Sequence, residues 1–187
     1  MLLDQIDKQI LNILLKDGRK SLSSLSKMVK KSNKDTMSHA GIAKRISKLG
    51  ELGILNVQGN LSAKALKYTV AFILIEMKNF EEVQKISEAY AECPRVFLLA
   101  HLNGQYNLIM GVVGQNVDVM RRYLNHCGPT NKEGILHSVV LFTSDLLHPK
   151  FIPINLFSGI SKEHKCGNIC KECTAFLDGQ CEGCGNF

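Results

Sequence analysis

The sequence lacks an apolar run long enough to cross a membrane. Its longest candidates, residues 70–75 and 108–113, are far shorter than the roughly 18 residues that a spanning helix needs. The first ten residues carry acidic side chains where a secretory signal would carry basic ones. We therefore expect a cytoplasmic protein that makes no contact with a membrane.

Cysteine is scarce before residue 158, where only Cys93 and Cys127 occur. Disulfides are uncommon in the cytoplasm, so we expect these two isolated cysteines to be small core residues. The histidines between residues 101 and 148 show no metal-ligand spacing. None of these histidines stands out as a catalytic residue, and we expect a protein that is not an enzyme.

Acidic residues are scarce in the first 68 positions, which hold 13 lysines and arginines against 5 aspartates and glutamates. The remaining positions reverse this balance, with 10 against 12. A basic segment on an otherwise mildly acidic chain is the electrostatic footprint of binding to a phosphate backbone. The shift in charge near Tyr68 also favours a division into two domains.

Apolar residues recur at helical spacing in three stretches of the basic segment. The first predicted helix covers residues 4–16, with Gly18 suited to a left-handed stop behind it. Ser21 is expected to cap the second helix. The third lies between residues 36 and 52.

The third predicted helix carries small, hydroxylated and cationic side chains on the face away from the core. Such a face can enter a DNA groove without clashes, and its lysines can reach phosphates. The alternative is a solvated basic face on a three-helix bundle, and composition alone weighs the two equally. The residues of this face are Thr36, Ala40, Lys44, Ser47 and Lys48.

Several residues of this segment have a spacing that resembles the Lrp/AsnC family, the leucine-responsive regulatory proteins of bacteria and archaea. The matching residues are Leu3-Asp4, Ile6-Asp7, Ile10-Leu11, Asp17-Gly18-Arg19, Lys44-Arg45-Ile46, Leu49, Glu51, Gly53 and Ile54. The resemblance implies a winged helix-turn-helix over residues 1–60, with the wing starting at residues 54–59, and a linker over residues 61–68. Arg45 matches the arginine that precedes a core position of the family's recognition helix, so it joins the predicted DNA-binding residues.

The chain departs from the family pattern before the third helix. It is longer than usual between Val29 and Ile46, and the extra residues fall at residues 30–35, which include three lysines. The insertion lengthens the turn before the recognition helix. Its lysines are candidates for additional phosphate contacts.

From residue 69 the pattern changes to alternating strands and helices. The order βαββαβ is the ferredoxin-like arrangement, so the predicted fold class is α+β. Strands are predicted at residues 70–77, 96–101, 106–113 and 135–143, and helices at residues 80–91 and 117–126.

This order also resembles the ligand-sensing domain of the same family, here residues 69–157. The resemblance implies a homodimer or higher homo-oligomer that holds a small-molecule effector near Gly104, Tyr106 and Asn107. Asn107 stands where the family commonly has Asp, and a neutral amide does not balance the ammonium group of an amino acid. A tight hairpin turn is the alternative role for Gly104.

The tail, residues 158–187, holds five cysteines spaced C-x3-C-x2-C-x7-C-x2-C. Two C-x2-C pairs can present four thiolates to one metal, whose binding would supply folding energy to a segment with almost no core. Zinc is favoured, and a 4Fe–4S cluster takes the same ligands. The predicted tetrad is Cys170, Cys173, Cys181 and Cys184, with Cys166 as either an alternative ligand or a redox-active neighbour.

Together these features predict a transcriptional regulator that binds double-stranded DNA. The metal in its tail is either structural or reports redox or metal status. The alternative is an enzyme similar to the sirohaem decarboxylases, which share the two-domain layout. Such an enzyme would rely on residues such as Arg95, His101 and Arg121. The intact basic third helix argues against it. In a third interpretation, the tail is a metal-dependent module that binds another protein.

Overall fold

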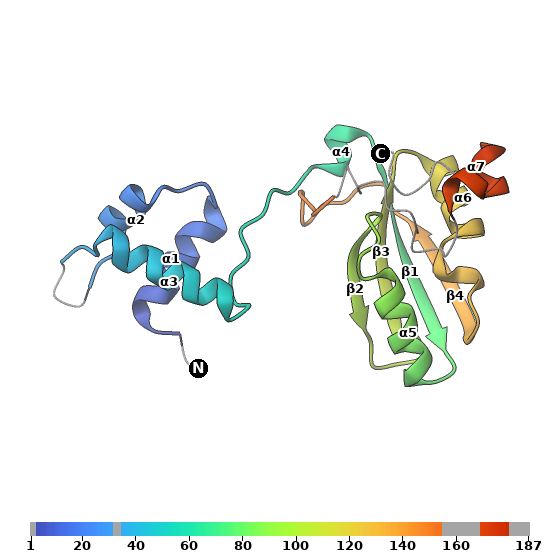
Figure 1. Cartoon of the computed structure of the whole chain (residues 1–187), viewed down its shortest axis with the longest axis horizontal. Helices are drawn as coiled ribbons and strands as arrows, with labels where there is room; N and C mark the ends of the chain where they lie inside the picture. Colours follow the sequence, from blue (N-terminus) through green and yellow to red (C-terminus); the bar gives the residue numbers. More distant parts are fainter. Residues whose placement is uncertain (1–2, 32–34, 155–168, 180–187) are drawn as a thin grey trace. The chain divides into compact units, whose positions relative to one another are not determined.

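The computed structural model describes residues 3–31, 35–154 and 169–179. The chain divides into two compact units, Met1–Gly59 and Asn60–Phe187, each of which is described by itself (Figure 1). Within the described residues, no helix has the length and apolar character that a membrane span requires.

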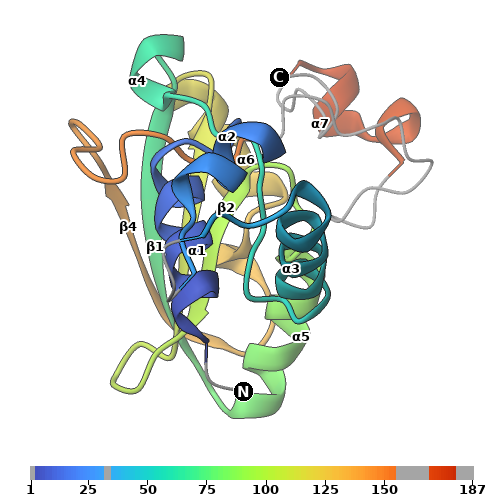
Figure 2. The same ribbon diagram turned by 90° about the vertical axis from the view of Figure 1, so that its left-hand side faces the viewer.

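The first unit consists of three helices, α1 (Gln5–Lys16), α2 (Leu22–Met28) and α3 (His39–Glu51). Each begins behind a residue whose side chain accepts a backbone N–H of the first turn, namely Asp4, Ser21 and Ser38. Figure 1 and Figure 2 show the three helices lying against one another. They pack around a small apolar core. Its buried members are Ile10, Leu14, Leu25, Val29 and Ile42.

The start of the third helix was predicted three residues too early. Ser38 accepts the N–H of Gly41 and so starts α3 at His39. Thr36 cannot join the helix because it pairs with Lys30 in an isolated antiparallel bridge. Thr36 is therefore exposed on the approach to α3 and does not lie on its outer face.

The prediction that Gly18 adopts a left-handed conformation was also wrong. Helix α1 ends at Asp17 in extended backbone, and Gly18 has no positive φ. A Cβ at Gly18 would lie 3.1 Å from the Val57 side chain, so this glycine lets residues 54–59 approach the end of α1. Residues 54–59, all of them described, contain no strand where the wing was predicted.

The second unit is built on an antiparallel sheet in the order β2-β3-β1-β4. This order, with one helix after β1 and one after β3, confirms the ferredoxin-like prediction (Figure 1). The strands are β1 (Thr69–Met77), β2 (Val96–His101), β3 (Leu108–Gly114) and β4 (Ile135–Phe142), and the helices are α5 (Phe80–Tyr90) and α6 (Val117–His126).

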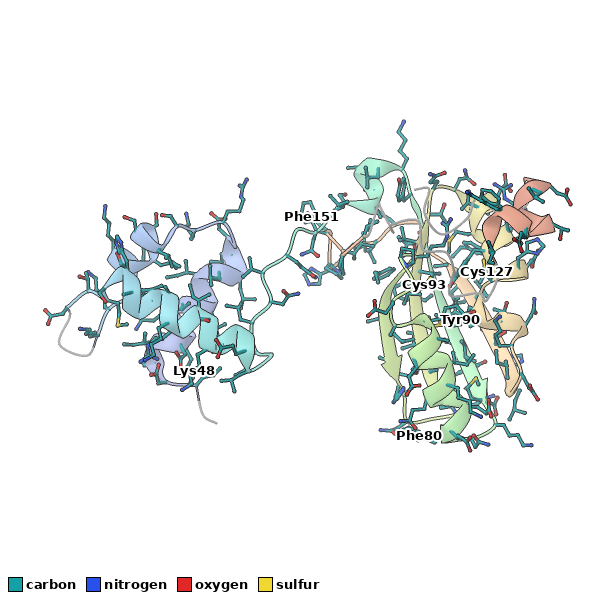
Figure 3. The ribbon with its side chains drawn as sticks, in the orientation of Figure 1. Lys48, Phe80, Tyr90, Cys93, Cys127 and Phe151 are labelled. Atoms are coloured by element: carbon teal, nitrogen blue, oxygen red, sulfur yellow. The ribbon has the colours of Figure 1, made fainter. Side chains whose placement is uncertain are left out.

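Alternate residues of the two central strands form the core of this unit. Ile73 and Ile75 of β1 and Met110 of β3 are fully buried against side chains of α5 and α6. Cys93 and Cys127 are buried in the same cluster, which confirms their prediction as core residues (Figure 3). Burial raises the pKa of the Cys93 thiol.

Residues 61–68, predicted as a linker, pack onto the second unit. Leu61 pairs with Ile152 through two backbone hydrogen bonds, and the short helix α4 (Ala63–Leu66) follows. Ala63, Val70, Val113 and Ile152 form a separate buried cluster. The division between the units therefore falls at Gly59, just before this segment.

Three further short elements complete the described part of the second unit. They are the 3-10 turns η1 (Pro129–Asn131) and η2 (Cys170–Glu172) and the helix α7 (Thr174–Leu177). Cys173 is half-buried and is the residue before α7. The predicted ligands Cys166, Cys181 and Cys184 lie outside the described residues.

Candidate nucleic-acid interface

The outer face of α3 presents the predicted DNA-binding residues to solvent. Ala40, Lys44, Ser47 and Lys48 are all exposed, and Figure 3 shows Lys48 on this helix. The Ser47 hydroxyl donates to the Glu51 carboxylate one turn later, at 2.9 Å. Ile42 and Leu49 on the opposite side are buried, so the helix has one face in the core and one face free for a partner.

A groove of about 460 Å³ lies between α3 and the start of α1. Acidic side chains line it from α1, and basic and apolar side chains line it from α3 and the segment before it. The lining residues are Asp4, Asp7, Met37, Gly41, Lys44, Arg45, Lys48 and Leu49.

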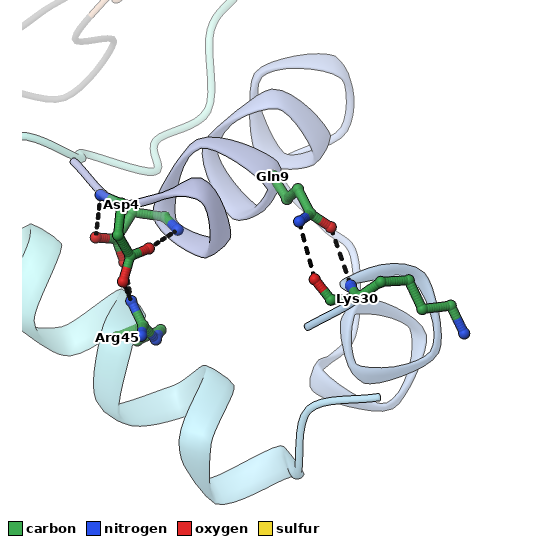
Figure 4. Close-up of polar contacts among 5 residues, drawn as sticks. Asp4, Gln9, Lys30 and Arg45 are labelled. Atoms are coloured by element: carbon green, nitrogen blue, oxygen red, sulfur yellow. Dashed lines mark hydrogen bonds and ion pairs between the residues drawn. The ribbon is translucent and has the colours of Figure 1, made fainter. Parts of the chain in front are cut away.

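Arg45 joins the two helices across this groove (Figure 4). Its Nη1 atom lies 2.6 Å from Oδ2 of Asp4 and 2.7 Å from Oδ1 of Asp7. The same two carboxylates form the capping box of α1, because each accepts the backbone N–H of the other residue. Arg45 therefore links the position of α3 to the first turn of α1.

The charges of this cluster stabilise each other. The backbone N–H of Asp7 lowers the pKa of the Asp4 carboxyl, and the Arg45 guanidinium lowers it further. The hydrogen bond to Asp4, followed by that to Asp7, raises the pKa of Arg45. The side chain of Asp7 is only 12% exposed and that of Arg45 is 31% exposed, so solvent screens this pair less than an ordinary surface pair.

Arg45 was predicted to contact DNA, and the structure places its guanidinium on two carboxylates. Reasoning from the sequence missed these partners, although Asp4 and Asp7 have the three-residue spacing of a capping box. Direct contact of Arg45 with DNA stays a prediction.

The predicted effector residues lie in and next to the connection between β2 and β3. The side chain of Asn107 is engaged with the end of β1, because Oδ1 accepts the N–H of Met77 and Nδ2 donates to the carbonyl of Met77, both at 2.9 Å. The Tyr106 ring lies 6.0 Å from the His137 ring. Gly104 is exposed and has no positive φ. Asn107 thus holds the connection between β2 and β3 to the end of β1. Its contact with an effector stays a prediction.

A three-helix unit with side-chain caps, an exposed basic third helix and a following ferredoxin-like domain defines a helix-turn-helix regulator. The AsnC-type helix-turn-helix domain matches residues 3–49. The HTH-type transcriptional regulator FL11 of Pyrococcus abyssi is 30% identical over 146 residues, which cover 75% of this chain and 91% of that relative. The chain belongs to the Lrp/AsnC family of DNA-binding transcriptional regulators, as predicted.

Solved structures agree with this fold. Escherichia coli AsnC is 21% identical with a TM-score of 0.63, and the match covers 79% of this chain and 95% of AsnC. A transcriptional regulator of Neisseria meningitidis, solved as a complex with L-methionine, is 18% identical with a TM-score of 0.64, covering 78% of this chain and 92% of that protein. The relatives are transcriptional regulators, and the decarboxylase alternative is not favoured.

Proposed function

We propose that this regulator binds duplex DNA through the exposed face of α3. Lys44 and Lys48 meet backbone phosphates, while Ala40 and Ser47 face the floor of the major groove. The observation that carries the proposal is the position of both lysines on the outer side of a helix whose inner side is buried. Arg45 supports this arrangement by holding α3 against α1.

The affinity of the chain for a labelled duplex is expected to fall steeply as the salt concentration rises, because each lysine–phosphate contact releases a counterion. In the K44Q/K48Q variant, the slope of log K against log salt is expected to become shallower by about 2. Fluorescence anisotropy over a salt series measures both slopes. A salt-independent affinity in the unmodified chain contradicts this mode of binding.

A matched control removes the same charge from the second unit. Lys78 and Lys150 are exposed, and neither forms an ion pair with any carboxylate among the described residues. The K78Q/K150Q variant is expected to keep the slope of the unmodified chain. An equal loss of slope in this control would mean that overall charge, and not the α3 face, determines binding.

We also propose that the chain acts as a homodimer or higher homo-oligomer and responds to a small effector near Gly104 and Tyr106. Two helix-turn-helix units related by a two-fold axis match two-fold DNA sites. The complex of the Neisseria relative with L-methionine supports a small-molecule effector in this family. Because the Asn107 amide is hydrogen-bonded to Met77, its role is to hold the hairpin that carries Gly104 and Tyr106.

For the tail, we propose that its cysteine thiolates hold zinc or, as the alternative, a 4Fe–4S cluster. Support comes from the five-cysteine spacing and from the η2 turn, which spans Cys170 and leads to Cys173 and α7. Within the described residues, no three potential ligands lie together, since three of the five cysteines are outside them. Bound metal would give the tail a folded form that responds to metal or redox status.

Metal analysis of protein purified without oxygen is expected to give about one zinc per chain, or about four irons if the tail holds a cluster. The C170S/C173S variant is expected to lose the metal because it removes one C-x2-C pair. The C166S variant is expected to keep it, because Cys166 is not in the proposed tetrad. Free thiols without metal in the unmodified chain would refute the proposal.

A further inference from the structure

We propose that the segment before α3 forms a second DNA-contacting element, whose lysines bind the phosphates that flank the groove occupied by α3. We call it the stem, meaning Lys30 and Lys31 on its outgoing side and Asp35 and Thr36 on its returning side. The inference rests on the proposed binding of DNA by α3 and extends it to a different part of the chain.

Backbone pairing gives the stem a defined shape. Lys30 and Thr36 form an antiparallel bridge, and the N–H of Lys31 donates to the carbonyl of Asp35 at 2.9 Å. Gln9 of α1 then binds both backbone groups of Lys30, accepting its N–H at 2.9 Å and donating to its carbonyl at 3.0 Å (Figure 4). One amide side chain thus fastens the stem to α1 as a neighbouring strand would.

Both ends of the stem are also held by the apolar core. Val29, directly before it, is fully buried. Met37, directly after it, packs against the same cluster. Only Ser38 separates Met37 from the first residue of α3. The stem is therefore fixed beside the N-terminal end of α3, the end at which recognition helices of this class meet the DNA.

The two stem lysines are available to an external anion. Both are exposed, and neither is within ion-pair distance of a carboxylate in the described chain. Other lysines differ, because Lys20 pairs with Asp17 at 3.4 Å and Lys64 with Asp145 at 2.6 Å. Two unneutralised cations on a fixed backbone suit the regularly spaced phosphates of a duplex.

The test compares salt slopes for a fluorescein-labelled duplex of random sequence, because phosphate contacts do not depend on base sequence. The K30Q/K31Q variant is expected to bind with a slope shallower by about 2, while the K78Q/K150Q control keeps the original slope. Far-UV circular dichroism is expected to be unchanged, since both substituted side chains are exposed.

A Gln9→Ala variant tests the role of the fixed backbone. It keeps every charge, so its salt slope is expected to stay unchanged while its affinity falls because the stem is no longer held in place. If K30Q/K31Q has the slope of the control, the stem does not contact DNA and the inference is overturned, although binding by α3 stands. If the unmodified chain does not bind the duplex at all, the proposed function itself fails.

Discussion

Replacing Arg45 with methionine is expected to lower the free energy of unfolding of the first unit by about 2 kcal/mol. Methionine keeps an unbranched apolar stem but removes the hydrogen bonds to Asp4 and Asp7. Asp7, whose side chain is 12% exposed, then keeps its charge without its cationic partner. Affinity for DNA is expected to fall as well, because α3 loses its link to α1.

The measurement must report the first unit alone. Residues 3–59 contain no tryptophan, tyrosine or phenylalanine, so aromatic signals do not follow their unfolding. Amide hydrogen exchange read by mass spectrometry resolves the peptides of α1 and α3. Lys44→Met on the exposed face of α3 is the control and is expected to change stability by less than about 0.5 kcal/mol. Equal protection in both variants would show that the Arg45 ion pairs do not stabilise the unit.

Acid provides a second test of the same cluster. The pKa of Asp4 is lowered in the folded chain, so the ionised carboxyl stabilises the fold above its ordinary pKa of 3.8. That contribution is lost as the pH falls through the lowered value. Part of the lowering of the Asp4 pKa comes from Arg45. The R45M variant is therefore expected to lose less stability than the unmodified chain as the pH falls below about 4. The hydrogen bond from the Asp7 N–H to Asp4 remains in this variant and keeps the other part of the pKa lowering.

Replacing Asn107 with aspartate is expected to destabilise the second unit by about 2–3 kcal/mol at neutral pH. The carboxylate can still accept the N–H of Met77, but it cannot donate to the Met77 carbonyl, which Nδ2 of Asn107 reaches at 2.9 Å. Two oxygens would then face each other where a hydrogen bond stood. The variant introduces the residue that the resemblance to the family implies at this position.

Denaturant unfolding followed by tyrosine circular dichroism measures this change, since all four tyrosines lie in the second unit. Asn103→Asp, in the exposed part of the same connection, adds the same charge and is expected to leave stability nearly unchanged. A protonated carboxyl at position 107 can donate to the Met77 carbonyl, so the fold favours the protonated form and raises the pKa of this carboxyl. The loss of stability in N107D should therefore shrink as the pH falls toward about 4. Wild-type stability of N107D at neutral pH would contradict the structural role of the amide.

The elements of the second unit were largely predictable because their signals are local. The predicted bounds of one strand and one helix, residues 96–101 and 117–126, are those observed for β2 and α6. Contacts between distant residues were not predictable in this way. The bridge between Leu61 and Ile152 joins residues far apart in the sequence, and no local sequence pattern predicts it.

In the candidate interface, too, local features could be predicted and contacts between distant residues could not. The exposed positions of Lys44 and Lys48 follow from helical periodicity within α3. The partners of Arg45 lie on another helix, and the anchoring of Lys30 by Gln9 joins residues 21 positions apart. A spacing rule finds residues that share a face, but it does not find the side chain that a neighbouring element supplies.

The bridge between Lys30 and Thr36 has a consequence for how this regulator can vary. Because the chain is closed at the bridge and held there by Gln9, the number of residues between Lys31 and Asp35 does not set where α3 begins. Insertions or deletions in that interval can lengthen or shorten the chain there while the helix cap at Ser38 keeps its place. The number of residues in this interval can therefore change without moving the start of α3.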